Sequence, residues 1–187
     1  MRQRRKRRSS RSRSALFSLG WLRIVIPILW LAWIAVIFIF SSQSYQKQSI
    51  QPLLHRTLTA QGADKVLPKV DFSYDHRKYS SDSNPFGMIE FLFRKGAHLF
   101  VYGMLAILTA MLMARFRIRG ASLAAFPLLT AGVVAVLDEM NQGHSPSRTP
   151  AYQDVFVDLT GASLGLLLYF FVRLMSRRYK SSSRHID

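Results

Sequence analysis

The sequence predicts an all-α membrane protein, a bundle of four transmembrane helices with a polar outer loop and both termini in the cytoplasm. Two observations predict this fold class. The hydrophobic residues make up 49% of the 187 and are gathered in four long runs, and a helix needs about 20 mostly apolar residues to cross the hydrocarbon layer. The formal net charge is +16, and many of the basic residues flank these runs, as expected for cytoplasmic segments.

The first predicted helix covers residues 21–40 and follows a basic leader, residues 1–20, which we expect to be disordered in the cytoplasm. A cleaved signal peptide would have an apolar core of about 7–15 residues, whereas this run is longer and contains three Trp. We therefore interpret it as an uncleaved anchor. The stretch RQRRKRRSSRSR contains eight basic residues and no aromatic one, which predicts contact with anionic lipid and no nucleic-acid partner.

Three further helices are predicted at residues 96–114, 120–139 and 154–175, and a basic tail follows at 176–187. A water-soluble bundle would place charged residues every few positions along each helix, and these runs do not. The outer loop, residues 41–95, is polar and poor in large apolar residues, so we expect no separate core there. Within it, we expect a short helix on the membrane surface, because helical spacing separates the apolar residues Ile50, Leu53, Leu54 and Leu58.

Basic residues set the predicted orientation of the membrane domain, residues 21–175. The leader, the RFRIR link between the second and third helices and the tail all fall on one side of the membrane, which the positive-inside rule assigns to the cytoplasm. The outer loop mixes acidic with basic residues and can lie outside. The sequence therefore predicts a multi-pass protein of the cell membrane.

With this orientation, the polar residues of the three later helices meet at the outer end of the bundle. Those of the second helix lie at i, i+3 and i+7, on one face. An Asp at the centre of a membrane helix costs about 2.5–3.5 kcal/mol, so we expect these groups to contact one another and not lipid. The predicted cluster, a candidate binding or catalytic site, consists of Lys95, His98, Tyr102, Asp138, Glu139, Gln142, Arg148, Asp154 and Asp158.

Charge pairing and close helix packing are expected within this cluster. Gly161 and Gly165 form a GxxxG pattern on the face that carries the aspartates of the fourth helix, and such a pattern lets a neighbouring backbone approach closely. Adjacent residues point about 100° apart on a helix, so at least one of the acids at 138 and 139 should face the bundle. The expected pairing sets Asp154, Asp158 and Glu139 against Lys95, Arg148 and His98.

A metal site in this cluster would be rich in carboxylates. It would combine His98 with Glu139, Asp154 or Asp158, a set that suits Mg²⁺ or Mn²⁺ better than Zn²⁺, and His144 could supply a second imidazole from the hairpin loop. The chain has no Cys, which excludes thiolate ligands and cysteine catalysis. From the sequence we assign no metal and no other cofactor.

Several sequence blocks resemble the VanZ family of small bacterial membrane proteins. They are FSSQS at the end of the first helix, FRKGAHLFVYGMLA, DEMNQ with Arg148 following, and DVFVDLTGASLG. The resemblance spans residues 33–170 and implies a multi-helix membrane protein whose characteristic positions are the predicted cluster and Gly161. The family name comes from a member associated with low-level resistance to the glycopeptide teicoplanin. Two positions depart from the pattern: Asn141 replaces a frequent His, which weakens any two-histidine metal site, and Ser147 replaces a frequent Gly.

The predicted function is recognition of a lipid or cell-wall-related ligand at the external face, which the resemblance links to teicoplanin resistance. The alternative is an intramembrane enzyme acting on a phosphate- or sugar-bearing lipid, in which Lys95 and Arg148 hold the phosphate and His98 or Glu139 transfers a proton. No GxSxG motif or phosphate-binding glycine loop accompanies these residues. A purely structural cluster stays open, whereas few polar residues in the inner helix halves argue against a proton-coupled carrier. Expected partners are the bilayer, this ligand and, in a homo-oligomer, a second copy.

Overall fold

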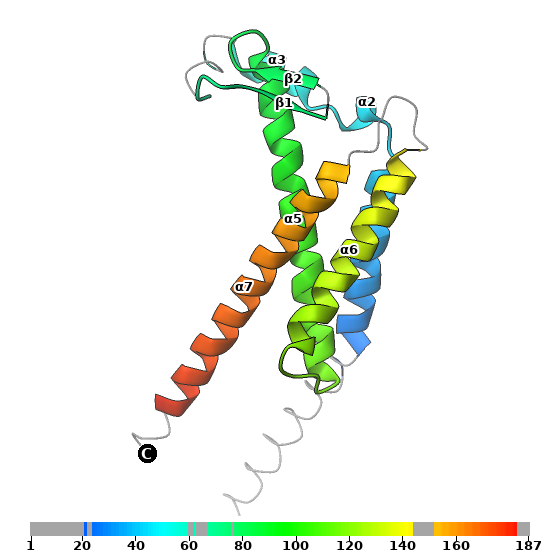
Figure 1. The fold of residues 1–187 in the computed structure, drawn as a ribbon, viewed down its shortest axis with the longest axis vertical. Coiled ribbons are helices and arrows are strands. Elements are labelled where there is room, and N and C mark those ends of the chain that lie inside the picture. Colours follow the sequence, from blue (N-terminus) through cyan, green and yellow to red (C-terminus); the bar gives the residue numbers. More distant parts are fainter. Residues whose placement is uncertain are drawn as a thin grey trace, which may run out of the picture.

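The computed structural model describes residues 21, 24–59, 62, 67–75, 77–143 and 152–182 of the chain. Four helices in this part are long and apolar enough to cross a membrane, and they run alternately up and down beside one another (Figure 1). The predicted fold class, an all-α membrane bundle, is confirmed. The four are the first helix, Ile24–Ser41, and α5 (Pro85–Arg115), α6 (Ser122–Gln142) and α7 (Tyr152–Ser182).

The helices α5, α6 and α7 each contact the other two, and the most extensive contact is that between α5 and α7. The buried core between the helices is rich in small residues, and Ala106, Ala131 and Ala162 have no exposed surface. Helix association in lipid depends on close van der Waals contact, which small residues allow. Large apolar side chains such as Phe100 and Leu129 are exposed, which is the arrangement expected of helices that face lipid.

Glycines set the distance between α5 and α7 where the two helices cross. A Cβ atom built at Gly161 would lie 2.7 Å from Leu99 Cα, and one built at Gly165 would lie 2.7 Å from Gly103 Cα. Carbon atoms in contact sit about 3.5–4.0 Å apart, so a larger residue at either position would separate the helices. The crossing holds the first turns of α7 against the polar face of α5, and beyond it α7 diverges from the bundle (Figure 1).

Within the described residues, four short elements form a cap over the end of the bundle where the first helix ends and α5 begins (Figure 1). In its antiparallel hairpin Phe72 lies opposite Tyr79, and their rings contact Phe91 of α5 at centroid distances of 5.4 and 4.4 Å. The short helix predicted near residues 50–58 is present, whereas the hairpin was not predicted. The elements are α2 (Tyr45–Gln48), α3 (Gln51–Thr57), β1 (Asp71–Tyr74) and β2 (Arg77–Ser80).

The start of α5 differs from the prediction, because the helix begins at Pro85 and not at residue 96. The side chain of Asn84 caps it by accepting a hydrogen bond from a backbone N–H of the first turn, at 2.9 Å. The prediction placed the start too late because the charges of Glu90 and Arg94 interrupt the apolar run. The Arg94 Nη2 and Glu90 Oε1 atoms lie 3.7 Å apart as an ion pair. Both residues stand in the early turns of α5, which contact the short elements of the cap.

The other two helices extend past their predicted ends. α6 runs to Gln142 and not to residue 139, so its last turn carries Asn141 and Gln142. α7 continues to Ser182, beyond the predicted end at residue 175. The turn that joins α5 to α6 contains Arg117 and Arg119 and lies at the same end of the molecule as the end of α7, opposite the cap (Figure 1).

Candidate functional site

Polar side chains from three helices and the hairpin meet inside the end of the bundle that the cap covers. On α5 they occupy one face, as their spacing predicts, and the glycine crossing holds the polar face of α7 directly against them. The last turns of α6 complete the group. We refer to these residues as the polar cluster: Tyr74, Lys95, His98, Tyr102, Asp138, Gln142, Asp154 and Asp158.

At the level of the cap, Asp154 binds two partners. Lys95 Nζ forms an ion pair with its Oδ1 atom, and the Tyr74 hydroxyl donates a hydrogen bond to the same atom at 2.5 Å. The Lys95 ammonium also lies 4.2 Å from the centre of the Tyr74 ring, a cation–π distance. Burial, followed by the hydrogen bond and charge of Asp154, raises the pKa of Tyr74. The Tyr74 phenol therefore stays protonated and acts as a donor.

One turn deeper, His98 contacts Asp158. The His98 Nδ1 atom lies 2.9 Å from Asp158 Oδ1, and the Asp158 side chain has no exposed surface. Isolated carboxylates are strongly disfavoured in such surroundings, so the hydrogen bond to the His98 imidazole offsets part of the cost of burying Asp158. The contact orients the ring and places Nδ1 toward α7, while His98 also lines the cavity described below.

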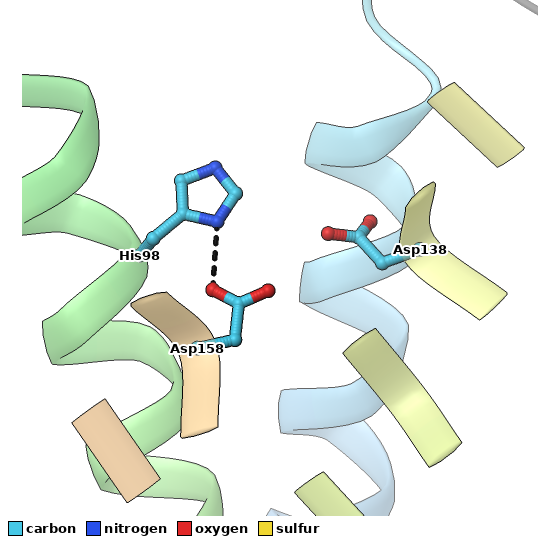
Figure 2. Close-up of side chains that lie close together, drawn as sticks. All are labelled: His98, Asp138 and Asp158. Carbon is cyan, nitrogen blue, oxygen red and sulfur yellow. Dashed lines mark hydrogen bonds and ion pairs between the residues drawn. The ribbon is translucent and has the colours of Figure 1, made fainter. Parts of the chain in front are cut away.

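Asp138 brings α6 into the cluster. Its Oδ2 atom accepts hydrogen bonds from the Tyr102 hydroxyl at 3.2 Å and from Gln142 Nε2 at 3.1 Å. Figure 2 shows the Asp138 carboxylate facing His98 and Asp158 from the opposite side. One ligand-type atom from each of these three residues lies within 4.8 Å of the other two.

The first helix is tied to the cluster through its last turn. Asn141 Nδ2 donates to the hydroxyls of Ser41 and Ser42, each at 3.0 Å, and Ser41 donates to the backbone oxygen of Asp138 at 3.3 Å. Lower down, Trp33 Nε1 donates to the backbone oxygen of Val101 at 2.9 Å. These contacts fix the first helix beside α5 and α6 at the height of the cluster.

A second polar group lies in the cap around Glu90, which is 2% exposed. Its Oε2 atom accepts hydrogen bonds from the Tyr45 hydroxyl at 3.0 Å and from Gln51 Nε2 at 2.8 Å. The Arg94 guanidinium lies over the Tyr45 ring at 3.9 Å. Burial, and then the charge of Glu90, raises the pKa of Tyr45. This group fastens α2 and α3 to α5.

A cavity of about 620 Å³ lies beside the polar cluster. The first helix contributes mainly apolar side chains to its walls, α5 contributes both apolar and charged ones, and α6 and the cap add mostly charged groups, amides and tyrosines. The space therefore suits a molecule with an apolar part and a polar headgroup. Its lining includes Trp33, Val36, Ile37 and Phe40 on the apolar side and Lys47, Tyr74, Arg77, Arg94, Lys95, His98, Asp138, Gln142 and Asp154 on the polar side.

The sequence model of the VanZ/LLP1 family matches residues 26–173, which include the polar cluster and most of each long helix. The chain belongs to the VanZ/LLP1 family. The predicted family resemblance is thereby confirmed, over slightly more of the chain than the sequence blocks indicated. No curated protein and no solved structure gave a significant match.

Most of the residues that the sequence singled out lie together in this VanZ/LLP1 protein. Asp154 contacts Lys95, as the expected pairing had it, and Asp158 contacts His98. Glu139 is buried beside them, at 6% exposure. Arg148, expected to pair with an acid, and His144, considered as a metal ligand, lie outside the described residues.

Sequence reasoning missed Tyr74 and the Glu90 group. Glu90 and Arg94 stand at i, i+4, a spacing typical of helical ion pairs, and this signal could have extended α5 backwards. No local signal marks Tyr74, because its contact with Asp154 joins residues 80 positions apart. Tyr74 reaches the cluster only because the hairpin packs on Phe91.

Proposed function

We propose that this VanZ/LLP1 protein binds an amphipathic lipid or lipid-linked cell-wall precursor at the external face of the cell membrane. The cavity beside the polar cluster is the observation that carries the proposal. Its apolar wall suits an acyl or prenyl chain, and its polar wall suits a phosphate- or sugar-bearing headgroup. By family resemblance, such binding would connect the protein to resistance against teicoplanin, an antibiotic directed at the cell wall.

The distribution of basic residues supports the external position of the cavity. The α5–α6 turn, with Arg117 and Arg119, and the end of α7 lie opposite the cap (Figure 1). The positive-inside rule assigns that end to the cytoplasm. The cap and the cavity then face outward, where cell-wall precursors are used.

The charges around the cavity support recognition of an anionic headgroup. Lys95 and Arg94 already have carboxylate partners in Asp154 and Glu90, so they offer little free charge. Lys47 and Arg77 line the same cavity and are exposed, and no ion pair joins either to a carboxylate of the described residues. An anionic headgroup entering between them would gain charge-assisted hydrogen bonds.

The His98–Asp158 contact favours a second candidate function, an intramembrane enzyme acting on the same class of lipid. A histidine whose Nδ1 atom is held by a buried carboxylate is a recurrent general acid–base arrangement. In this reading His98 would exchange a proton with a headgroup in the cavity. Incubation of the purified protein with envelope lipids, followed by mass spectrometry, would distinguish the two: a binder returns its lipid unchanged, an enzyme changes its mass.

A cavity-filling substitution tests the proposed function. Ala97 lines the cavity, so Ala97→Trp should occupy the space and remove the lipid that co-purifies with the wild-type protein in native mass spectrometry. Gly96→Trp is the matched control, because Gly96 is the neighbouring residue, does not line the cavity and has open space around a built Cβ.

The same two variants connect binding to the cell. A bacterial host carrying wild-type protein or Gly96→Trp should tolerate more teicoplanin than one carrying Ala97→Trp at equal membrane levels. Equal lipid retention by both variants would contradict the proposed site. Lipid loss without any change in teicoplanin tolerance would keep the binding site and remove the link to resistance.

A further inference from the structure

Two buried carboxylates face each other inside the bundle, Asp138 on α6 and Asp158 on α7 (Figure 2). Asp158 has no exposed surface and Asp138 is 3% exposed. One oxygen of each is engaged, Asp158 Oδ1 by His98 and Asp138 Oδ2 by Tyr102 and Gln142. The other oxygens, Asp158 Oδ2 and Asp138 Oδ1, are buried and accept no hydrogen bond from the described residues.

This arrangement leaves negative charge uncompensated. A buried carboxylate oxygen without a partner is strongly destabilising, and two facing carboxylates repel each other in a medium of low dielectric constant. An imidazolium at His98 would balance one of the two charges. A proton shared by the acids would also remove only one charge, whereas a divalent cation bound by a neutral His98 imidazole would balance both.

We propose that His98, Asp138 and Asp158 form a binding site for a divalent metal cation. The three already offer ligand atoms within 4.8 Å of one another. A six-coordinate ion of the Mg²⁺ type holds neighbouring ligand atoms about 3 Å apart, so rotations of these side chains would close the set around it. Two carboxylates with one imidazole favour Mn²⁺ or Mg²⁺. The ion would bind the two oxygens that accept no hydrogen bond and would neutralise the charge of the two carboxylates.

The position of this site also narrows the headgroup chemistry. His98 and Asp138 line the cavity, so an ion enters from the cavity and turns its remaining coordination positions toward it. Phosphate oxygens are the ligands that Mg²⁺ commonly takes beside carboxylates. The cavity ligand is then a phosphate-bearing lipid whose phosphate completes the coordination shell, an assignment that rests on the proposed function.

Manganese binding to the full-length protein tests the site without any lipid. Protein in detergent, stripped with a chelator, is titrated with Mn²⁺ while electron paramagnetic resonance follows the free ion. We expect one saturable Mn²⁺ per chain with a Kd below about 1 mM, the weak limit for oxygen-rich extracellular sites. Asp158→Asn and Asp138→Asn should each weaken binding at least about tenfold. His98→Gln should abolish the ¹⁴N hyperfine coupling of the bound ion.

The control is Asp82→Asn, which removes an exposed carboxylate that pairs with Lys69 and lies outside the polar cluster and the cavity lining. It should bind Mn²⁺ as the wild-type protein does. Equal weakening by Asp82→Asn and Asp158→Asn would mean general attraction by acidic residues and would overturn the site. The site would also be overturned if the wild-type protein showed no saturable Mn²⁺ binding or no ¹⁴N coupling. Neither measurement depends on the folding of a variant.

Lipid retention is measured separately, with and without Mn²⁺, so that the two proposals can fail independently. Saturable Mn²⁺ binding without any retained lipid would keep the metal site and contradict the proposed function. Lipid retention that does not change with Mn²⁺ would contradict the phosphate-to-metal contact alone. Retention that increases in wild-type protein but not in Asp158→Asn would support the whole assignment.

Discussion

Replacing Gly161 by alanine is expected to separate α5 from α7 and to break the polar contact next to the crossing. The new Cβ atom would lie 2.7 Å from Leu99 Cα and 2.9 Å from the Leu99 carbonyl carbon. Since carbon atoms in contact need about 3.5–4.0 Å, the helices must move apart by about 1 Å. Backbone cannot rotate away as a flexible side chain could.

This displacement reaches the polar cluster directly. Asp158 lies one turn before Gly161, and His98 directly precedes Leu99, so the same shift stretches the 2.9 Å contact between His98 and Asp158. A shift of about 1 Å takes that contact beyond hydrogen-bonding range. Overpacking costs about 1–3 kcal/mol, and a lost hydrogen bond to a charged group costs about 1.5–3 kcal/mol. The better helix propensity of alanine returns about 1 kcal/mol.

The expected net loss for Gly161→Ala is roughly 1.5–5 kcal/mol, which for a chain of this size lowers the melting temperature by at least about 3 °C. Thermal unfolding in detergent measures it. Gly96→Ala adds the same methyl group to a helix position with open space and should not destabilise. Equal melting temperatures for these two variants would refute the packing argument. In a double-mutant cycle, Gly161→Ala and Asp158→Asn should be less than additive, because both disturb one contact.

Three further outcomes are expected from thermal unfolding in detergent. Lys95→Met should destabilise more than the double change of Lys95→Met with Asp154→Asn, since the single change leaves the carboxylate without its cation; additive effects would argue against this. Tyr74→Phe should flatten the alkaline limb of the profile of melting temperature against pH. Because the pKa of Tyr74 is raised in the folded protein, the protonated phenol contributes stability below the ordinary tyrosine pKa of about 10, and this contribution is lost as the pH rises above about 10. Trp30→Phe, which removes the 2.9 Å bond to Thr109, should cost about 0.5–1.5 kcal/mol; an unchanged melting temperature would show that the bond contributes nothing.

The four long helices could be predicted because each is encoded in a continuous apolar run. The signal fails where a helix leaves the apolar layer. Glu90 and Arg94 lower the hydropathy of a segment that is still helical, so the predicted start of α5 was too late. The hairpin was missed for a different reason. Its stability comes from Phe72 and Tyr79 packing on Phe91, a contact between separate segments that no local pattern contains.

The candidate site could be predicted as a set of residues but not as a set of contacts. Helical spacing placed Lys95 and His98 on one face of α5, and charge bias placed the acids at the same height. Which acid meets which base depends on the depth and rotation of α7, and these are fixed by the backbone contact at Gly161. Spacing also left open which of the adjacent acids at 138 and 139 turns inward, and both are in fact buried.

Asn141 offers a last test, of how the first helix is held at the cluster. Its amide donates to Ser41 and Ser42 at 3.0 Å each, so Asn141→Ala should remove two hydrogen bonds at about 0.5–1.5 kcal/mol each. The lower half of that range is expected, because the amide is only half-buried. Asn141→His, which introduces a side chain that can donate once in its neutral form, should recover about half of the loss. Ser41→Ala in the Asn141→Ala background should add little beyond its bond to Asp138, because the bond between the two is already gone. If Asn141→His instead proves less stable than Asn141→Ala, the position is governed by the space between the helices and not by these hydrogen bonds.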